Sequence, residues 1–145
     1  MYFRTPDGQF NLANFMRAEL YAAFGALKLG MDILSEKENV RAEKFTGHGG
    51  LFKVRGVAQQ FLADALNADV RVMNTAGEGG AWGMALLAAF MNCGKGATLP
   101  EWLENSVFGG QESTTLSPTP KGASGFARYI ERFRAGLSAQ RRAAD

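Results

Sequence analysis

The chain has 145 residues, which corresponds to about one domain. Its composition, 46% hydrophobic and 21% charged, excludes a disordered chain, a collagen-like chain and a coiled-coil rod. The net charge of +2 at pH 7 is too small to indicate nucleic acid or an acidic membrane as a partner. The single cysteine, Cys93, excludes an internal disulfide bond and favours a reducing compartment, so we expect a cytoplasmic protein.

The first predicted element is an amphipathic helix over residues 11–35, with Asn11 as its N-cap. Apolar residues recur at steps of three and four, which indicates one broad buried face. They are Leu12, Met16, Leu20, Phe24, Leu27, Met31 and Leu34. Polar residues 36–39 end the helix.

Two short strands with a helix between them follow. The first strand is predicted over Val40–Thr46, mainly because the glycine-rich turn of residues 47–50 comes directly after it. The intervening helix carries helically spaced apolar residues from Val57 to Leu66, and the second strand is Val70–Met73. Strands joined through one helix favour parallel pairing, so the fold class is α/β with short parallel strands and several helices.

The second half of the chain reads as helical. Thr75 and Glu78 have the spacing of a capping box, and the helix that they would open, to about Met91, is apolar nearly all round and therefore predicted to be buried. Thr98 and Glu101 repeat the pattern before a short helix that ends at Phe108. Residues 109–122 are predicted as a loop and residues 126–137 as the last helix.

Two strands make a poor sheet by themselves. The rest of a sheet is therefore expected outside this chain, on its N-terminal side. An open sheet edge has to be covered, so we expect self-association through that edge or through neighbouring apolar helix faces.

The junction of strand, Gly47-His48-Gly49-Gly50 and helix is the strongest local signal for a ligand. Backbone amides at the start of a helix favour phosphate, and Lys53 and Arg55 could add positive charge. A tight turn without a ligand is the alternative reading of the same spacing. A second glycine cluster nearly matches a dinucleotide fingerprint, but Trp82 occupies its third glycine position, so a capped core helix is the preferred reading.

No residue is assigned a catalytic role, and no metal site is predicted. The single histidine, His48, is expected to be a polar loop residue, and Cys93 is expected to pack as a small apolar side chain. Nothing in the spacing of Asp64 and Glu78 indicates a paired acid and base. Trp82 and Trp102 are expected in the core.

Three runs in this order, residues 46–51, 60–70 and 77–89, resemble the C-terminal domain of FGGY carbohydrate kinases. The shared features are a Gly-Gly turn, a helix with an Ala-Asp-hydrophobic pattern, a short strand, and a helix of the form Ala-x-Gly-x-Ala-hydrophobic-hydrophobic-Ala. The resemblance covers about residues 11–93. The ribulokinase- and xylulokinase-like members of the family are the nearest, and the spacing from Gly49-Gly50 to Asp64 is closer to the ribulokinase-like ones.

The resemblance implies part of a ribonuclease H-like, actin-like ATPase domain. Residues 1–93 would be the later half of the C-terminal kinase domain, and residues 94–145 a helical extension of it. The family transfers phosphate from ATP, with Mg²⁺, to a sugar hydroxyl, here a pentulose such as xylulose or ribulose. The base and the sugar pocket would belong to upstream parts, including the N-terminal kinase domain, so this chain alone is expected to be inactive.

Carried over by position, Gly49 and Gly50 match the turn that lines the ATP site, and Leu51 follows them. Lys53 and Arg55 occupy the stretch from which the family draws its adenine contacts, although the asparagine common there is missing. A non-enzymatic α/β module that binds a ligand or a partner is the alternative function.

Overall fold

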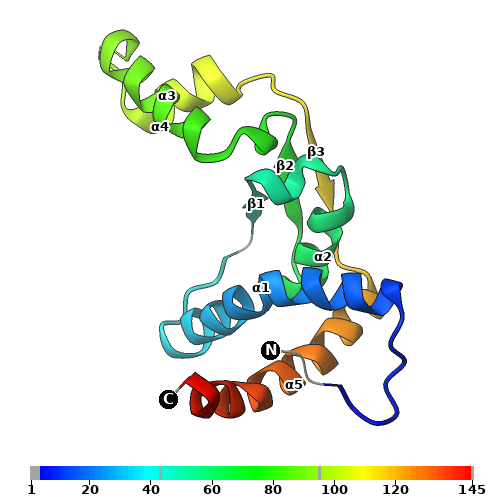
Figure 1. Ribbon diagram of the computed structural model, residues 1–145. Helices are drawn as coiled ribbons and strands as arrows, with labels where there is room; N and C mark the ends of the chain where they lie inside the picture. Colours follow the sequence, from blue (N-terminus) through cyan, green and yellow to red (C-terminus); the bar gives the residue numbers. More distant parts are fainter. Residues whose placement is uncertain (1–3, 43, 95, 145) are drawn as a thin grey trace.

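The computed structural model describes residues 4–42, 44–94 and 96–144 (Figure 1). The helices are α1 (Leu12–Lys37), α2 (Val57–Leu66), α3 (Gly79–Cys93), α4 (Leu99–Trp102) and α5 (Pro120–Ala144). The strands are β1 (Phe45–Gly47), β2 (Val70–Met73) and β3 (Ser113–Leu116). Two 3₁₀ turns, η1 (Gly50–Lys53) and η2 (Ala76–Glu78), follow β1 and β2, and the π-helical turn η3 (Leu103–Phe108) continues α4.

The sheet has three strands in the order β1-β2-β3. The predicted parallel pairing of β1 with β2 is confirmed, with Phe45 opposite Val70. The sheet is nevertheless mixed, because β3 pairs antiparallel with β2 and places Leu116 opposite Val70. The prediction of a loop over residues 109–122 was wrong for Ser113–Leu116, which form β3. The short run of serine and threonine resembles a turn by composition, whereas the edge of β2 gives it hydrogen-bonding partners.

Strand β1 is shorter than the predicted Val40–Thr46, because only Phe45–Gly47 pairs with β2. Glu43 lies outside the described residues. Strand β1 is short because its partner β2 begins only at Val70. The chain before Val70 is the end of α2, which Asn67 caps in the left-handed region at φ 51°. The described residues just before Phe45 therefore have no residue of β2 to pair with.

The core lies where α1, α2 and α5 meet one end of the sheet. Its buried members are Tyr21, Phe24, Ala58, Leu62, Ala63, Ala65, Val70, Phe126 and Ile130. Helix α1 buries Tyr21, Phe24 and Gly25, whereas Leu12, Met16, Leu27 and Leu34 of the predicted face are exposed. Helical spacing predicted the helix but not which of its apolar residues pack against another element.

Two polar side chains on α2 hold the C-terminal segment against the core. The buried Gln59 donates from Nε2 to the carbonyl oxygens of Val70 (2.8 Å) and Thr114 (2.9 Å). Asp64 Oδ1 accepts the backbone N–H of Thr119 at 2.7 Å, just before α5 begins. Buried polar groups with all partners present fix one arrangement of the elements that they join. The segment after residue 94 therefore carries a strand as well as helices, and its helix α5 belongs to the same core.

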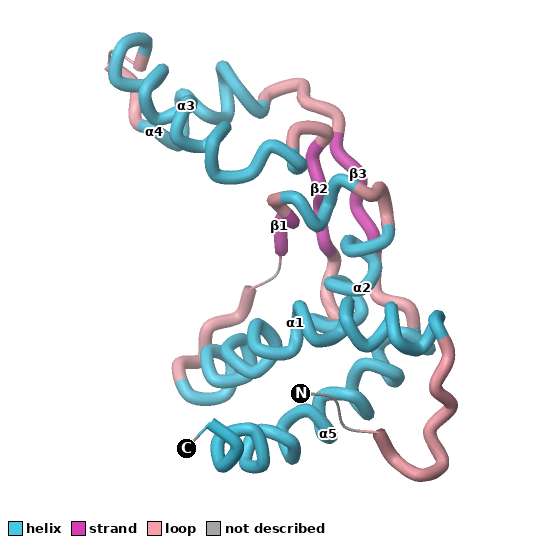
Figure 2. Tube along the Cα trace, viewed as in Figure 1, coloured by secondary structure: helices cyan, strands magenta, loops and turns pink. Residues whose placement is uncertain are grey.

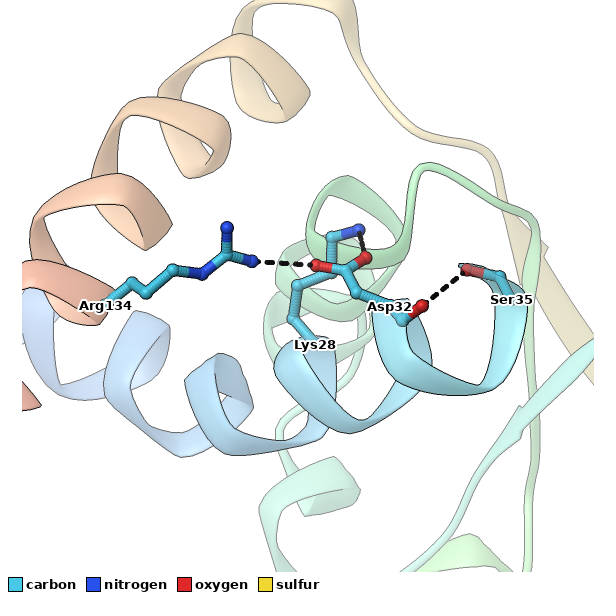
Figure 3. A network of polar contacts seen from close by, with 4 residues as sticks. All are labelled: Lys28, Asp32, Ser35 and Arg134. Atoms are coloured by element: carbon cyan, nitrogen blue, oxygen red, sulfur yellow. Dashed lines mark hydrogen bonds and ion pairs between the residues drawn. The ribbon is translucent and has the colours of Figure 1, made fainter. Parts of the chain in front are cut away.

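Helices α1 and α5 are also joined at the surface (Figure 3). Asp32 pairs with Lys28 one turn earlier on α1, at 2.5 Å, and with Arg134 of α5, at 3.5 Å. Ion pairs near the surface contribute little free energy each, so the apolar core and not this network holds the two helices together.

Helices α3 and α4 lie at the opposite end of the sheet from α1 and α5 (Figures 1 and 2). The prediction that α3 is buried was wrong: it has no buried residue, and Met84 and Met91 are 68% and 84% exposed. We call α3, α4 and η3 together the arm. No helix within the described ranges is long and apolar enough to cross a membrane.

The two predicted capping boxes have different outcomes. Thr75 makes no cap hydrogen bond; its hydroxyl donates to Gln111 Oε1 at 3.2 Å, and α3 begins only at Gly79, after η2. At α4 the Glu101 carboxylate accepts both the backbone N–H (2.9 Å) and the hydroxyl (2.7 Å) of Thr98. These bonds hold the pKa of the Glu101 carboxyl below its usual value, with the backbone bond as the larger cause.

Candidate functional site

The glycine turn after β1 is tied to the segment after β2. The Gly49 N–H donates to the Ala76 carbonyl at 2.7 Å, and the Gly49 carbonyl accepts from the Phe52 N–H at 3.0 Å. Gly49 has φ +112°, a conformation that disfavours any side chain. The Gly49 N–H is therefore already bonded within the chain.

The glycines of this turn have different roles. A Cβ added to Gly47 would overlap the ring of Phe52, so glycine at this position permits close packing. A Cβ added to Gly50 would meet no atom within 4 Å, and Gly50 is not among the residues with positive φ. Neither packing nor backbone strain within the described chain therefore requires glycine at position 50.

A groove lined by both polar and apolar side chains lies beside β2, with a volume of about 610 Å³, and we call it the β2 groove. It is lined by Phe52, Lys53, Val54, Arg55, Gly56, Gln59, Val72, Met73, Asn74, Gly77, Glu78, Thr114 and Leu116. Arg55 donates from Nη2 to Asn74 Oδ1 at 3.1 Å, and Asn74 donates in turn to Glu112 at 3.1 Å. The groove thus holds both predicted cationic residues, with the guanidinium oriented by an amide.

A second hollow, the α3–α4 cavity, has a volume of about 460 Å³ and a largely apolar lining. It is lined by His48, Gly49, Gly79, Gly80, Trp82, Gly83, Leu86, Leu87, Leu99, Leu103 and Phe108. The rings of His48 and Trp82 stack, with their planes 14° apart. None of the lining residues is Lys, Arg, Asp or Glu, so the two hollows differ in charge.

The five predicted site residues do not line one pocket. Gly49 lines the α3–α4 cavity, whereas Lys53 and Arg55 line the β2 groove. Gly50 and Leu51 begin η1, the turn that leads from one hollow to the other, and Leu51 is 44% exposed. The structure therefore places the predicted residues along a continuous stretch between two hollows.

The sequence reading missed the aromatic part of the site. His48 is an exposed loop residue, as expected, but its stacking on Trp82 was not predicted, and Trp82 is half-buried rather than in the core. Trp82 in place of the third glycine of a fingerprint was a signal that could have been read as a ligand contact. The expectation that Cys93 packs as a small apolar side chain was wrong, because this cysteine is exposed at the end of α3.

Metal ligands are sparse in the described part of the chain. It contains no group of three or more His, Cys, Asp or Glu side chains that could hold a metal ion. Mg²⁺ in phosphoryl-transfer sites is commonly held by one or two carboxylates together with substrate phosphates. Glu78 is the one carboxylate among the lining residues of the β2 groove, so these residues alone do not form a complete magnesium site.

Comparison with known proteins places this geometry in a family. None of the curated proteins and none of the solved structures that were searched matches the chain. A family model described as the C-terminal domain of the FGGY family of carbohydrate kinases matches residues 3–91. The match includes β1, the glycine turn, α2, β2 and most of α3, together with nearly all residues that line the β2 groove. The chain therefore belongs to the FGGY family of carbohydrate kinases, as its C-terminal domain, within an actin-like ATPase fold.

Proposed function

We propose that this chain is the ATP-binding part of a sugar kinase, which transfers the γ-phosphate of ATP to a sugar hydroxyl. The observation that carries the proposal is Gly50. It lies in the region matched by the kinase family, and the space beside it is filled by no atom of the described chain. A nucleotide lying against Gly49, Gly50 and Leu51 gives a reason for that open space.

Lys53 and Arg55 suit the phosphates of this nucleotide. Both line the β2 groove, and the hydrogen bond from Arg55 to Asn74 orients the guanidinium. A planar guanidinium can bind phosphate with two parallel hydrogen bonds, and an ammonium adds a point charge. Mg²⁺ would be held mainly by the phosphates and by carboxylates outside this chain, because Glu78 is the one carboxylate among the described residues that line the groove.

The sugar is proposed to be a pentulose, xylulose or ribulose. Its pocket and the base for its hydroxyl would come from the N-terminal kinase domain and the rest of a ribonuclease H-like sheet, so the chain alone should not phosphorylate any sugar. Comparison of kcat/KM for xylulose, ribulose and glycerol, with the two kinase domains combined, tests the substrate. Turnover of a pentulose by this chain alone would contradict the assignment of the sugar pocket and the base to other parts of the kinase.

We also propose a reducing, cytoplasmic location for the protein, and the free thiol of Cys93 supports it.

The substitution Gly50→Val tests the ATP site. In the kinase formed with the N-terminal domain, the Michaelis constant for ATP should rise about tenfold or more, because one good contact to a phosphate contributes about 1.5–3 kcal/mol. The Michaelis constant for the sugar should change much less. Calorimetry with the isolated chain should show the same loss of ATP affinity.

The control is Gly30→Val on α1, where an added Cβ also meets no atom within 4 Å. Thermal unfolding of both variants separates a folding defect from a binding defect. If the Gly50→Val variant has the stability of the control and an unchanged Michaelis constant for ATP, the glycine turn is a tight turn that binds no ligand.

Association of the chain is a further part of the proposal. Strand β1 lies at one edge of the sheet and, among the described residues, pairs with β2 alone, which supports an unsatisfied edge. We expect the isolated chain to self-associate and to dissociate when the N-terminal kinase domain covers the same surface. A monodisperse monomer at high concentration in sedimentation experiments, with ordinary stability, would contradict this expectation.

A further inference from the structure

The chain segment that leads into β3 lies beside the end of β2 (Figure 1). Three successive residues of this segment accept hydrogen bonds from side chains of β2 and of the turn after it. The pairs are Thr75 with Gln111 at 3.2 Å, Asn74 with Glu112 at 3.1 Å, and Arg71 with Ser113 at 2.8 Å. The backbone N–H of Asn74 also donates to the Glu112 carbonyl at 3.2 Å. Residues 111–113 lie outside the region 3–91 that the family model matches, so the match assigns them no role.

Asn74 lies between a group that only donates hydrogen bonds and a group that only accepts them. The Arg55 guanidinium has no acceptor, and its Nη2 donates to Asn74 Oδ1 at 3.1 Å. The Glu112 carboxylate has no donor, and its Oε2 accepts from Asn74 Nδ2 at 3.1 Å. The two neighbours together allow one orientation of the amide, with its oxygen towards Arg55. Without Glu112 the amide is free to rotate, and the guanidinium then loses the acceptor that holds it.

Lys53 is held in a different way. A Cβ added to Gly77 would lie 3.0 Å from Cγ and 3.5 Å from Cε of Lys53, so the aliphatic stem of the lysine lies across this glycine. The direction of the lysine stem therefore depends on Gly77, whereas that of the Arg55 guanidinium depends on Asn74 and Glu112. The residues after β2 thus orient both cations that line the β2 groove.

We infer that Glu112 is a positioning residue for the phosphates of the nucleotide: it fixes the Asn74 amide, which in turn holds Arg55 in place to bind phosphate. The inference rests on the proposed function, because the phosphate contacts of Arg55 belong to that proposal. Glu112 is not among the residues that line the β2 groove, whereas Arg55 and Asn74 are. Glu112 therefore acts on the phosphates through the amide.

The negative charge of Glu112 makes the inference testable by the sign of an effect. A carboxylate near a phosphate site repels the anion, so removal of its charge alone strengthens phosphate binding. Removal of its hydrogen bond has the opposite effect, because an arginine that is already ordered loses less conformational freedom when it binds. The side chains of Arg55, Asn74 and Glu112 are exposed, so neither change should alter the free energy of unfolding by much.

Two substitutions of Glu112 separate the hydrogen bond from the charge. Glu112→Ala removes both, whereas Glu112→Gln removes the charge and keeps an oxygen that accepts from Asn74. The probe is inorganic tripolyphosphate, which carries the phosphates without base or sugar, and calorimetry with the full chain gives its affinity. We expect Glu112→Ala to bind it about two- to tenfold more weakly than Glu112→Gln, which is the usual cost of ordering one long side chain on binding. Glu112→Gln should bind it at least as tightly as the unchanged chain.

Ser113→Ala is the matched control. It removes the neighbouring hydrogen bond from Arg71 in the same segment, and neither Ser113 nor Arg71 lines the β2 groove. Its affinity for tripolyphosphate should equal that of the unchanged chain. In an Arg55→Ala background, Glu112→Ala should cause no further loss of affinity, because the group that it positions is gone. NMR relaxation of the Arg55 Nε–Hε group should show greater motion in Glu112→Ala than in Glu112→Gln.

Each outcome decides the inference. Weaker binding by Glu112→Ala than by Glu112→Gln, with Ser113→Ala unchanged, supports it. If Glu112→Ala binds tripolyphosphate as tightly as Glu112→Gln or more tightly, or if Ser113→Ala shows the same loss, the inference is overturned. In these cases the chain still binds phosphates, and the proposed function stands. A chain that binds no tripolyphosphate, or that binds it equally well as Arg55→Ala, overturns the inference and the phosphate-binding role of Arg55 together.

Discussion

The two ends of the molecule differ in the burial of their helices, and the more apolar helix is the exposed one. At the core end, Phe126 and Leu62 are 1% and 6% exposed. In the arm, α3 has the more continuous apolar sequence, yet Leu87 is 46% exposed and no residue of the helix is buried. An apolar helix is buried only when another element is available to cover it, and the described chain offers α3 only the short elements of the arm.

The difference in burial indicates that the core end provides the stability of the fold and that the arm provides space for a ligand. The core end has the interdigitated aromatic rings of Tyr21, Phe126 and Tyr129, with centroids 5.1–5.8 Å apart. The arm has the α3–α4 cavity and unfilled space beside its glycines. Substitutions at the core end should therefore change the free energy of unfolding, whereas those in the arm should change what the chain binds.

The largest expected effect is the loss of a core aromatic. Phe126→Ala should lower the free energy of unfolding by about 3–5 kcal/mol, because the side chain is fully buried and its cavity cannot collapse easily. Met91→Ala in the arm should change it by less than about 0.5 kcal/mol, since Met91 is 84% exposed. Urea unfolding of both variants checks the pair. Equal losses would remove the distinction between the two ends.

The next effect concerns the join between α2 and α5. A Cβ at Gly122 would overlap the Asp64 carboxylate, so Gly122→Ala should lower the free energy of unfolding by about 1–3 kcal/mol. Asp64→Ala should have a similar cost, because the Thr119 N–H loses its acceptor. In the double variant the overlap is gone, so the two losses should not add, and a double-mutant cycle measures the coupling. Additive losses would show that the two residues do not interact.

A smaller effect compares two glycines of α1. Gly30→Ala should raise the free energy of unfolding by about 0.5–1 kcal/mol, since the position is helical and open. Gly25→Ala should gain less or become destabilising, because an added Cβ would lie 3.1 Å from the Phe133 ring of α5. Thermal unfolding measures both. A larger gain at Gly25 would indicate that α1 and α5 pack less tightly than described.

The smallest effect is the pH dependence of the cap of α4. The pKa of Glu101 is held below its usual value by the backbone N–H and then the hydroxyl of Thr98. A lowered pKa means that the stabilisation is present above the pKa of the unfolded chain and is lost as the pH falls through the folded value. In Thr98→Ala the backbone bond remains, so the pKa should move only part of the way back. An NMR titration of the Glu101 carboxyl that is identical in both proteins would contradict this assignment.

Much of the local structure follows from the sequence alone. Asn11 caps α1 through its side chain, which accepts the Asn14 N–H at 2.8 Å, and the Glu101 carboxylate bonds back to Thr98 at the start of α4. The parallel pairing of β1 and β2 was also predictable, because one connecting helix constrains the direction of the second strand. The two caps depend on residues that are close in the chain, where propensity and covalent geometry dominate, and the pairing depends on one short connection.

The sequence determined the family and the candidate residues from Gly49 to Arg55, because an ordered set of glycines and apolar residues is specific even when each motif is weak. Tertiary structure alone decided which faces are buried, that β3 joins the sheet, and that these residues extend between a groove and a cavity. The reason is distance along the chain. Gln59 meets Thr114 and Gly49 meets Ala76 only after folding, so no local pattern contains those contacts. A side chain's burial depends on what packs against it, and the chain must be folded before that neighbour exists.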